Sequence, residues 1–255
     1  MNMPENEVLR QLSARKSVRA FAPELITPEE REAILTAAAQ APTAGNQQFY
    51  TILDITDQAL KERMADLCDH QPFIAQAPLV LVFLADSRRW AQVYRAAGED
   101  PRPAGPGDAL LAIADACIAA QNAVTAAWSL GIGSCYIGDV LENCEQMREA
   151  LHLPTDVLPA AMLVFGRPTQ QQAERRKPAR FALDYVVQQN TYRDQTPQVH
   201  REAVEARAAA DGKSNFDFDH WTKAFGARKY ESAFSREMSR SAAVYLADYK
   251  VPETK

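Results

Sequence analysis

Positively charged side chains gather in two segments that lie far apart in the sequence. The first segment contains Arg15, Lys16, Ser17 and Arg19, and the second contains Lys177 and Arg180. Guanidinium and ammonium groups beside a hydroxyl suit a phosphate, because charge-assisted hydrogen bonds are about twice as strong as neutral ones and arginine binds two oxygens at once. If folding brings the two segments together, they form a clamp for a doubly charged anion. A basic run of this kind is otherwise only a solvated loop.

Uncharged hydrogen-bonding side chains occur between the two basic segments. They are Asn46, Gln48 and Gln71. A carboxamide carries both donors and acceptors, which suits the edge of a heterocycle. A strand bracketed by Gly131 and Gly138 would also let a flat ligand approach its backbone closely. A flat, phosphorylated, hydrogen-bonding ligand indicates flavin mononucleotide (FMN).

Other common catalytic patterns are absent from the sequence. It contains no G-x-S-x-G, no H-E-x-x-H, no Walker loop and no G-x-G-x-x-G. The histidines are dispersed, and the cysteines form neither a C-x-x-C pair nor a Cys/His ligand spacing. The sequence therefore predicts no metal site and no catalytic side chain, so that the chemistry would belong to the cofactor.

A helix from Leu110 to Leu130 is expected at the centre of the fold, since apolar or small residues cover nearly every face of it. The strand at 132–138 follows it directly. A buried helix with an ordinary glycine cap and a core strand explains this stretch without any ligand. Further strands are expected at 49–55, 78–84 and 158–165, and further helices at 8–12, 28–41, 58–68, 142–151, 199–210 and 229–249. The Pro/Gly loop at 100–107 is either a mobile lid or a connection.

Length and composition are those of one substantial globular domain with an extension. The chain has 255 residues, 47% of them hydrophobic, and a formal net charge of −5. This charge gives no reason to expect nucleic acid as a partner, and polar residues interrupt the apolar central helix, so no membrane span is expected. The lack of a secretory leader pattern and of a disulfide framework favours the cytoplasm. We expect a main domain at 1–192 and a helical extension at 193–255 that wraps the main body or a partner subunit.

Four motifs in order along the chain resemble the signatures of the nitroreductase family. They are Arg15-Lys16-Ser17-Val18-Arg19-Ala20-Phe21, Pro42-Thr43-Ala44-Gly45-Asn46-Gln47-Gln48, Gly131-Ile132-Gly133-Ser134-Cys135-Tyr136-Ile137-Gly138 and Lys177-Pro178-Ala179-Arg180-Phe181. The similarity covers about Glu7 to Tyr192. The tail resembles the longer branch of the family, which contains NADPH-dependent nitroreductases and flavin reductases. Each motif alone is weak, but four in the same order are specific.

The resemblance implies an α+β fold with a central, mostly antiparallel sheet flanked by helices, in an intertwined homodimer with FMN in each of two interface sites. By position, the two basic segments would hold the phosphate and ribityl end, and Gln71 would meet the ring or the ribityl chain. The residues that would come from the partner subunit are Thr43, Ala44 and Asn46, with Gln48 in the same loop. The residues that would lie against one flavin face near N5 are Tyr136, Ile137 and Gly138.

Some positions depart from the family pattern. The chain has Thr43-Ala44 where the family often has two serines, and Asp69-His70 precede Gln71 where the longer branch often has two glycines. In the tail, Arg240 and Arg228 match basic positions that the longer branch associates with the 2′-phosphate of NADPH. Both arginines fit a solvated helix surface equally well.

These residues predict an FMN enzyme. It would take a hydride from NADPH or NADH and pass the electrons to a small electron-poor acceptor in a ping-pong sequence. Nitroaromatics, quinones and free flavin are the acceptors expected. One alternative is a specialised flavoenzyme of the same fold, such as a reductive dehalogenase or a flavin-consuming enzyme. The other is a flavin-binding protein without turnover.

Overall fold

The computed structural model describes residues 4–251, which form two compact units. The first unit comprises the described residues up to Arg175 together with those from Glu237 onward, and the second comprises Arg176–Arg236. The boundary expected at residue 192 therefore lies inside the second unit. The last helix begins in the second unit and ends in the first, because Tyr245 in its C-terminal half is buried in the first unit.

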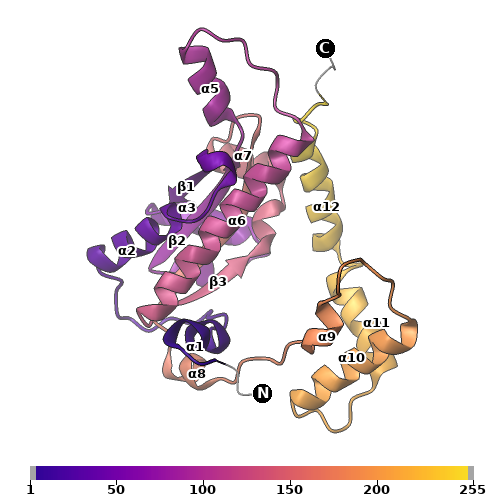
Figure 1. The fold of residues 1–255 in the computed structure, drawn as a ribbon. Coiled ribbons are helices and arrows are strands. Elements are labelled where there is room, and N and C mark those ends of the chain that lie inside the picture. Colours follow the sequence, from indigo (N-terminus) through magenta and orange to yellow (C-terminus); the bar gives the residue numbers. More distant parts are fainter. Residues whose placement is uncertain (1–3, 252–255) are drawn as a thin grey trace. The chain divides into compact units, whose positions relative to one another are not determined.

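A four-stranded antiparallel sheet forms the centre of the first unit (Figure 1). Its strands are β1 (Tyr50–Asp54), β2 (Leu79–Asp86), β3 (Gly133–Ile137) and β4 (Val157–Gly166), in the order β1-β2-β4-β3. All three strand pairs are antiparallel. Strands β2 and β4 are buried on both faces, which explains why they read as continuous apolar runs. All four strands were expected from the sequence, and β3 lies at an edge of the sheet.

Helix α6 (Pro106–Ser129) lies against one face of the sheet together with α2 (Pro28–Ala39). Seven of its nine alanines are buried, and the small side chains let it lie close to its neighbours. It begins four residues before the expected start, because Gly105 is its N-cap, Pro106 opens its first turn and Asp108 accepts a hydrogen bond from the Gly105 amide (2.7 Å). The loop expected at 100–107 therefore includes the start of the helix. Among the described residues, α6 is the one helix long and apolar enough to span a membrane, and its burial against the sheet accounts for that composition.

The opposite face of the sheet is covered by α3 (Gln58–Leu67), α4 (Phe73–Gln76) and α7 (Cys144–Leu151). The alternation of side chains along β2 sends Leu81 and Phe83 into the layer of α6 and sends Val80 and Val82 into the layer of α3. The first unit is thus a helix–sheet–helix sandwich, which confirms the expected α+β fold. Its remaining elements are α1 (Glu7–Ala14), η1 (Ala44–Asn46), α5 (Arg88–Ala96), η2 (Gly138–Leu141) and α8 (Gln170–Glu174).

The second unit is helical and contains α9 (Leu183–Val186), α10 (Pro197–Ala210), α11 (Phe218–Lys229) and the start of α12 (Ala233–Leu246). Aromatic rings pack its interior: Trp221 stacks on Phe225 with ring centroids 4.7 Å apart, and the guanidinium of Arg207 lies 4.2 Å from the Phe181 ring. The end of α12 buries Tyr245 and, beyond the helix, Tyr249 in the first unit. The described residues from Glu237 onward therefore belong to the first unit, and the wrapping of the main body by the expected extension stays a prediction.

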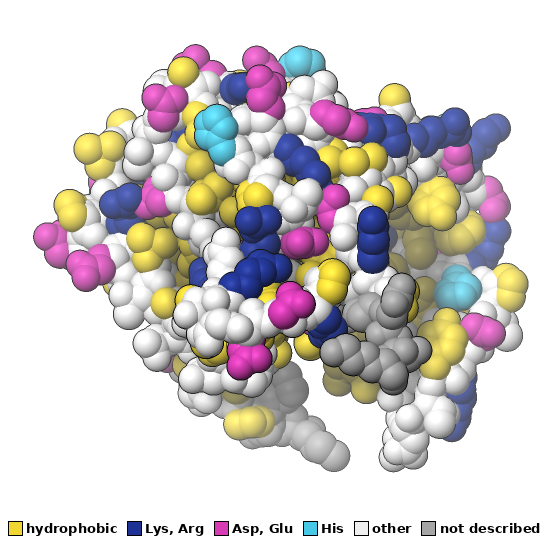
Figure 2. All heavy atoms as spheres, turned by 90° about the horizontal axis from the view of Figure 1, so that it is seen from above, with side chains coloured by type: hydrophobic (Ala, Val, Ile, Leu, Met, Phe, Trp, Pro, Cys, Tyr) yellow, Lys and Arg dark blue, Asp and Glu magenta, His cyan; other side chains and the backbone are white. Residues whose placement is uncertain are grey.

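Charges on the surface are mixed. Figure 2 shows acidic and basic side chains interspersed over the face that it draws. Some charged side chains of the described residues form ion pairs, such as Arg63 with Glu149 (2.6 Å) and Arg201 with Asp219 (2.6 Å). The drawn face therefore carries no broad region of a single sign, in keeping with the small net charge.

Candidate functional site

The first basic segment runs alongside the edge strand β3. Ser17 forms a parallel bridge with Ser134, and the Val18 amide donates to the Ser134 carbonyl (2.9 Å). This close approach requires a glycine, because a Cβ on Gly133 would meet Val18 Cγ2 at 2.5 Å. The buried Val18 side chain anchors the segment. The hydrophilic residues on either side of it are thereby held along the outer edge of the sheet.

Three of the predicted phosphate ligands converge on this strand. Burial raises the pKa of the Cys135 thiol, and the charges of Arg19 and Arg15 together with hydrogen bonds from Ser17 and Arg19 act in the opposite direction. Both guanidinium groups and the hydroxyl therefore lie near one point of β3. Arg19 is exposed and Arg15 is half-buried, so both groups remain accessible to a ligand.

Lys16 points toward a different neighbour. Its Nζ donates to the carbonyls of Ala173 (2.5 Å) and Arg175, and the Arg175 guanidinium donates in return to the Ser17 carbonyl (2.7 Å). These bonds tie the end of α8 and the residue after it to the basic segment. Lys16 thus has a structural role in this structure, and its contact with a phosphate stays a prediction.

The loop before β1 is held by a buried carboxylate on the central helix. Asp115 accepts hydrogen bonds from the Thr43 hydroxyl, the Ala44 amide (2.9 Å) and the Phe49 amide (3.2 Å). It is 3% exposed, so these bonds lie in an environment where an unpaired donor is costly. Asp115 therefore fixes both ends of the loop. In the sequence, Asp115 is a charged residue within an otherwise apolar helix. That feature was the one sign that it has a particular function.

Within this loop, two of the predicted ligands are already engaged. The Thr43 hydroxyl accepts from the Gln48 amide (2.8 Å) while it donates to Asp115, and Gln48 Nε2 donates to the Ala39 carbonyl (3.1 Å). Asn46 is exposed and has a left-handed φ of 57°, next to Gly45 at 56°. The loop is thus a preformed turn that presents Asn46, and the predicted contacts of its residues with a cofactor stay predictions.

Gln71 lies close to the end of β3. Its Nε2 donates to the Cys68 carbonyl (2.8 Å) and to Asp139 Oδ2 (2.5 Å). The two residues before it, Asp69 and His70, have left-handed φ values of 59° and 51°. Glycine is the usual residue at such positions, and a side chain there carries strain of about 1 kcal/mol or more. The departure from glycines noted in the sequence therefore falls on a tight turn that aims Gln71.

The other residues predicted beside the ligand form the open end of β3. Tyr136 is 39% exposed, whereas Ile137 is buried in the core and offers only its backbone. The Tyr136 hydroxyl donates to Gln121 Oε1 (3.4 Å), and burial of the ring raises the pKa of Tyr136 to about 12. A Cβ on Gly138 would meet no atom within 4 Å. There is open space beside the backbone at Gly138, where a flat ring was predicted.

A buried carboxyl group lies just behind this end of the strand. Glu142 is 4% exposed, and its Oε1 has no hydrogen-bond partner among the described residues. Burial, followed by the negative charge of the adjacent Asp139, raises the pKa of Glu142 to about 8. Glu142 therefore holds a proton at neutral pH. The sequence analysis did not identify it.

The second basic segment lies in the second unit. Arg180 lines a cavity of about 170 Å³ with Arg207 and Trp221, and the neighbouring Ala179 amide donates to Asp211 (2.7 Å). Lys177 precedes it in the same unit. The convergence of Lys177 and Arg180 with the first segment stays a prediction.

The tail arginines have local partners. Arg240, in the part of α12 that belongs to the first unit, forms a two-pronged pair with Glu145 (2.9 and 2.8 Å) and also binds Glu237 (2.7 Å). The Arg228 guanidinium lies 5.6 Å from the Phe225 ring and is exposed. A role for either residue with NADPH stays a prediction, and for Arg240 a phosphate would compete with two carboxylates.

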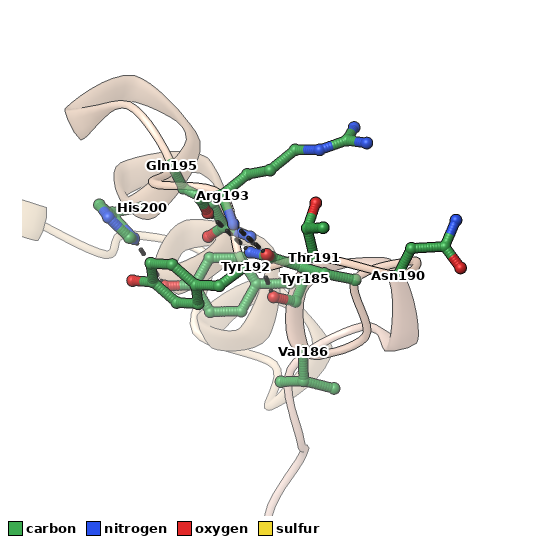
Figure 3. A pocket seen from close by; sticks show the side chains of 9 residues that line it. Tyr185, Val186, Asn190, Thr191, Tyr192, Arg193, Gln195 and His200 are labelled. Atoms are coloured by element: carbon green, nitrogen blue, oxygen red, sulfur yellow. Dashed lines mark hydrogen bonds between the residues drawn. The ribbon is translucent and has the colours of Figure 1, made fainter.

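The largest cavity that we describe, about 460 Å³, lies in the second unit beside Tyr185 and Tyr192. The Tyr185 hydroxyl bonds His200 Nδ1 (2.8 Å), and the Asn190 and Arg193 side chains extend away from the tyrosine rings (Figure 3). None of the predicted FMN ligands lines it. Cavity size alone therefore does not identify the predicted site.

Comparisons with known proteins agree with the four motifs. The family model described as "Nitroreductase family" matches residues 12–167. The chain belongs to the nitroreductase family. This membership confirms the resemblance drawn from the sequence, and the matched residues include three of the four motifs.

Among relatives of this nitroreductase-family chain, the oxygen-insensitive NADPH nitroreductase of Salmonella typhimurium is 37% identical over 181 residues, which cover 71% of this chain and 72% of that protein. The FMN reductase [NAD(P)H] of Bacillus subtilis is 35% identical over 193 residues, covering 74% and 76%. The structure of NADPH:FMN oxidoreductase from Vibrio harveyi, complexed with NAD+, matches with a TM-score of 0.71 at 26% identity, covering 87% of this chain and 97% of that one.

Proposed function

We propose that this chain is an FMN-dependent NAD(P)H oxidoreductase that reduces small electron-poor acceptors such as nitroaromatics, quinones or flavins. One observation carries the proposal: in a chain of the nitroreductase family, two arginines and a serine gather on β3 beside a backbone that leaves room for a flat ring. The named activities of the Salmonella and Bacillus relatives support the same reaction class.

The residues of this site fit FMN in charge and in shape. Arg15, Ser17 and Arg19 offer charge-assisted donors for a phosphate. The space beside Gly138 admits an isoalloxazine ring against the backbone of β3, because no side chain of the described chain fills it. In this proposal Lys16, Lys177 and Arg180 complete the phosphate site, and Thr43, Ala44, Asn46 and Gln48 belong to the loop of the partner subunit that covers it.

When bound, FMN supplies the hydride and electron transfer. The protein binds the phosphate, orients the ring along β3 and keeps one face open for a second flat molecule. Tyr136 remains a neutral phenol because its pKa is raised to about 12, so it offers an aromatic wall and a hydrogen bond rather than a charge. NADPH or NADH and the acceptor would occupy the same open face in turn, as a ping-pong sequence requires.

The proposal includes a homodimer, and exposed apolar side chains on α6 support it. Leu110 is 67% exposed, Leu111 49% and Ile118 41%, and α1, which packs near α6, exposes Val8 at 60%. Apolar surface of this kind on neighbouring helices favours association with a second copy. A cytoplasmic location also belongs to the proposal, since the three buried cysteines and the half-buried Cys117 are free thiols.

Anaerobic stopped-flow spectroscopy of the purified, FMN-loaded protein tests the function. We expect NADPH or NADH to bleach the flavin band within seconds and a quinone or a nitroaromatic compound to restore it. A protein that stays colourless after FMN is added contradicts the proposal. A yellow protein that does not bleach with either nicotinamide is a flavin carrier instead.

A further inference from the structure

The orientation of the Gln71 amide is fixed by its two partners. Both hydrogens on Nε2 are used, one by the Cys68 carbonyl (2.8 Å) and the other by Asp139 Oδ2 (2.5 Å). A carbonyl and a carboxylate only accept hydrogen bonds, so the amide nitrogen must face them both. The oxygen Oε1 consequently points to the other side of the amide.

The backbone of Gln71 is engaged as well. Its amide donates to the Ala65 carbonyl (3.0 Å), and its carbonyl accepts from the Ile74 amide (3.1 Å). Within residues 4–251, Oε1 is therefore the polar atom of Gln71 that is left for another molecule. Gln71 is half-buried, and Asp139 follows Gly138 directly, so Oε1 belongs to the same end of β3 as the open space beside that glycine.

The carboxyl groups of Asp139 and Glu142 lie together, and burial followed by the negative charge of Asp139 raises the pKa of Glu142 to about 8. The Glu142 amide also donates to the Asp139 carbonyl (3.0 Å), which fixes the turn of η2. The acceptor that holds Gln71 is thus itself held in place.

We propose that Asp139 is a positioning residue that turns the Gln71 amide so that its oxygen, and not its nitrogen, faces the bound flavin. The inference rests on the proposed FMN site. It assigns the chemistry of the contact: the group of FMN opposite Gln71 is a hydrogen-bond donor, either the ring N3–H or a ribityl hydroxyl, and not a ring carbonyl. An amide free to turn would offer N–H donors to the ring carbonyls and change the electron affinity of the flavin.

The test compares Asp139→Ala with Asp139→Asn. Asparagine retains an oxygen that accepts from Gln71 Nε2, so we expect Asp139→Asn to bind FMN as the unmodified protein does. Asp139→Ala releases the amide, and we expect an FMN dissociation constant about tenfold higher, with a shifted visible spectrum and a shifted midpoint potential of the bound flavin. Asp66→Ala is the charge control, since Asp66 is 75% exposed and its contact is with His70 (3.4 Å).

A double-mutant cycle distinguishes loss of the Gln71 orientation from a general loss of stability in Asp139→Ala. In a Gln71→Ala background, Asp139→Ala should change neither the spectrum nor the dissociation constant further, because the amide that it positions is gone. An additional loss in that background, or an Asp139→Ala protein whose spectrum and affinity match those of the unmodified protein, overturns the inference.

FMN analogues identify the donor. If Oε1 accepts from the ring, N3-methyl-FMN should bind the unmodified protein as weakly as Asp139→Ala binds FMN. If Oε1 accepts from the ribityl chain, one of 2′-deoxy-FMN, 3′-deoxy-FMN and 4′-deoxy-FMN should do so. Either result supports the inference, and an unchanged affinity for all four analogues contradicts it. A different result would contradict the proposed function: the unmodified protein would not bind FMN at all.

Discussion

Asp115, in the middle of α6, accepts a hydrogen bond from the hydroxyl of Thr43, which lies 72 residues earlier in the chain. The same carboxylate accepts from the amides of Ala44 and Phe49, so one buried side chain fixes the whole loop between α2 and β1. This loop is the one proposed to cover the FMN of a partner subunit. The central helix therefore sets the shape of the site although none of its residues was predicted to touch the cofactor.

Asp115→Ala is expected to lower both stability and FMN affinity. The substitution leaves two backbone donors and a hydroxyl without their acceptor, which costs about 3 kcal/mol in the free energy of unfolding. Urea unfolding of the FMN-free protein measures that loss, and titration with FMN measures the affinity. The stability and the FMN affinity of Asp115→Asn should lie between those of the unmodified protein and Asp115→Ala. Asparagine keeps one oxygen acceptor, whereas its NH2 group in place of Oδ2 would be a donor facing the Phe49 amide.

A control on the same helix separates the two effects. Asn122 donates to the Ala37 carbonyl (3.1 Å) on α2 rather than to the loop. Asn122→Ala should reduce stability and leave the affinity for FMN unchanged. Equal losses of FMN affinity in Asn122→Ala and Asp115→Ala would show that the loop has no particular part in binding.

Only part of the fold and of the candidate site could be predicted from the sequence. The apolar runs of β2 and β4 and the glycine after α6 are local signals, and each of them predicted its element. Asp115 could be recognised as an oddity in an apolar helix. Its partners could not be recognised, since they depend on how β1 and α6 pack.

Helices α5 and α11 were not expected, for two different reasons. Helix α5 has apolar residues at helical spacing, namely Trp90, Val93 and Tyr94, but it is only nine residues long and none of them is buried. Helix α11 mixes aromatic residues with a glycine, and its rings pack on each other within a small unit rather than on a large core. The predicted pairing of Lys177 with Arg15 depends on how the two units meet, which no local pattern determines.

Gly138→Ala should leave folding almost unchanged and impair FMN binding. The added methyl meets no atom of the described chain within 4 Å, so the unfolding temperature of the FMN-free protein should stay the same. It would occupy the space proposed for the ring, and we expect FMN affinity to fall by about 1 kcal/mol or more. Thermal unfolding and FMN titration of one preparation give both values.

Gly133→Ala provides the contrast on the same strand. Its Cβ would lie 2.5 Å from Val18 Cγ2 and 2.7 Å from Val18 Cβ, so the FMN-free protein should itself be destabilised. Val18→Ala in the same protein should restore stability only in part, because the contact with Cβ remains. If the Gly138→Ala protein binds FMN with the affinity of the unmodified protein, the flavin ring does not lie against the backbone at Gly138.

Arg19→Ala is expected to weaken FMN binding by about 2 kcal/mol, or about thirtyfold in the dissociation constant, because the phosphate loses a charge-assisted partner. Arg10→Ala is a matched control, since Arg10 is an exposed arginine on α1 whose ion pair is with Glu7. Fluorescence titration of FMN at low and at moderate salt measures the affinity. Similar affinities in the two variants would remove Arg19 from the phosphate site.

Arg240→Ala should raise the KM for NADPH and leave that for NADH unchanged if Arg240 meets the 2′-phosphate. The pKa of Glu145 is lowered to about 2, chiefly by its hydrogen bond with Arg240, so this carboxylate is charged and competes for the guanidinium. Glu145→Gln should therefore lower the KM for NADPH. Steady-state kinetics with both nicotinamides tests the pair, and an unchanged preference in both variants would leave Arg240 with the sole role of holding α12 on α7.

Glu142 predicts a stability that falls as the pH rises. Its pKa is about 8 in the folded chain and 4.5 is the ordinary value, so between these pH values the folded state binds a proton that the unfolded state has released. More protons on the folded state mean that the free energy of unfolding decreases with pH, by about 1.4 kcal/mol per pH unit from this group. Near and above pH 8 the contribution levels off.

Glu142→Gln removes this dependence, since glutamine keeps the shape of the protonated acid and does not titrate. Between about pH 5.5 and about pH 7 the unmodified protein should lose about 2 kcal/mol relative to the variant. Urea unfolding at a series of pH values, with the FMN-free forms of both proteins, measures the difference. Parallel pH profiles would mean that Glu142 ionises at its ordinary pKa.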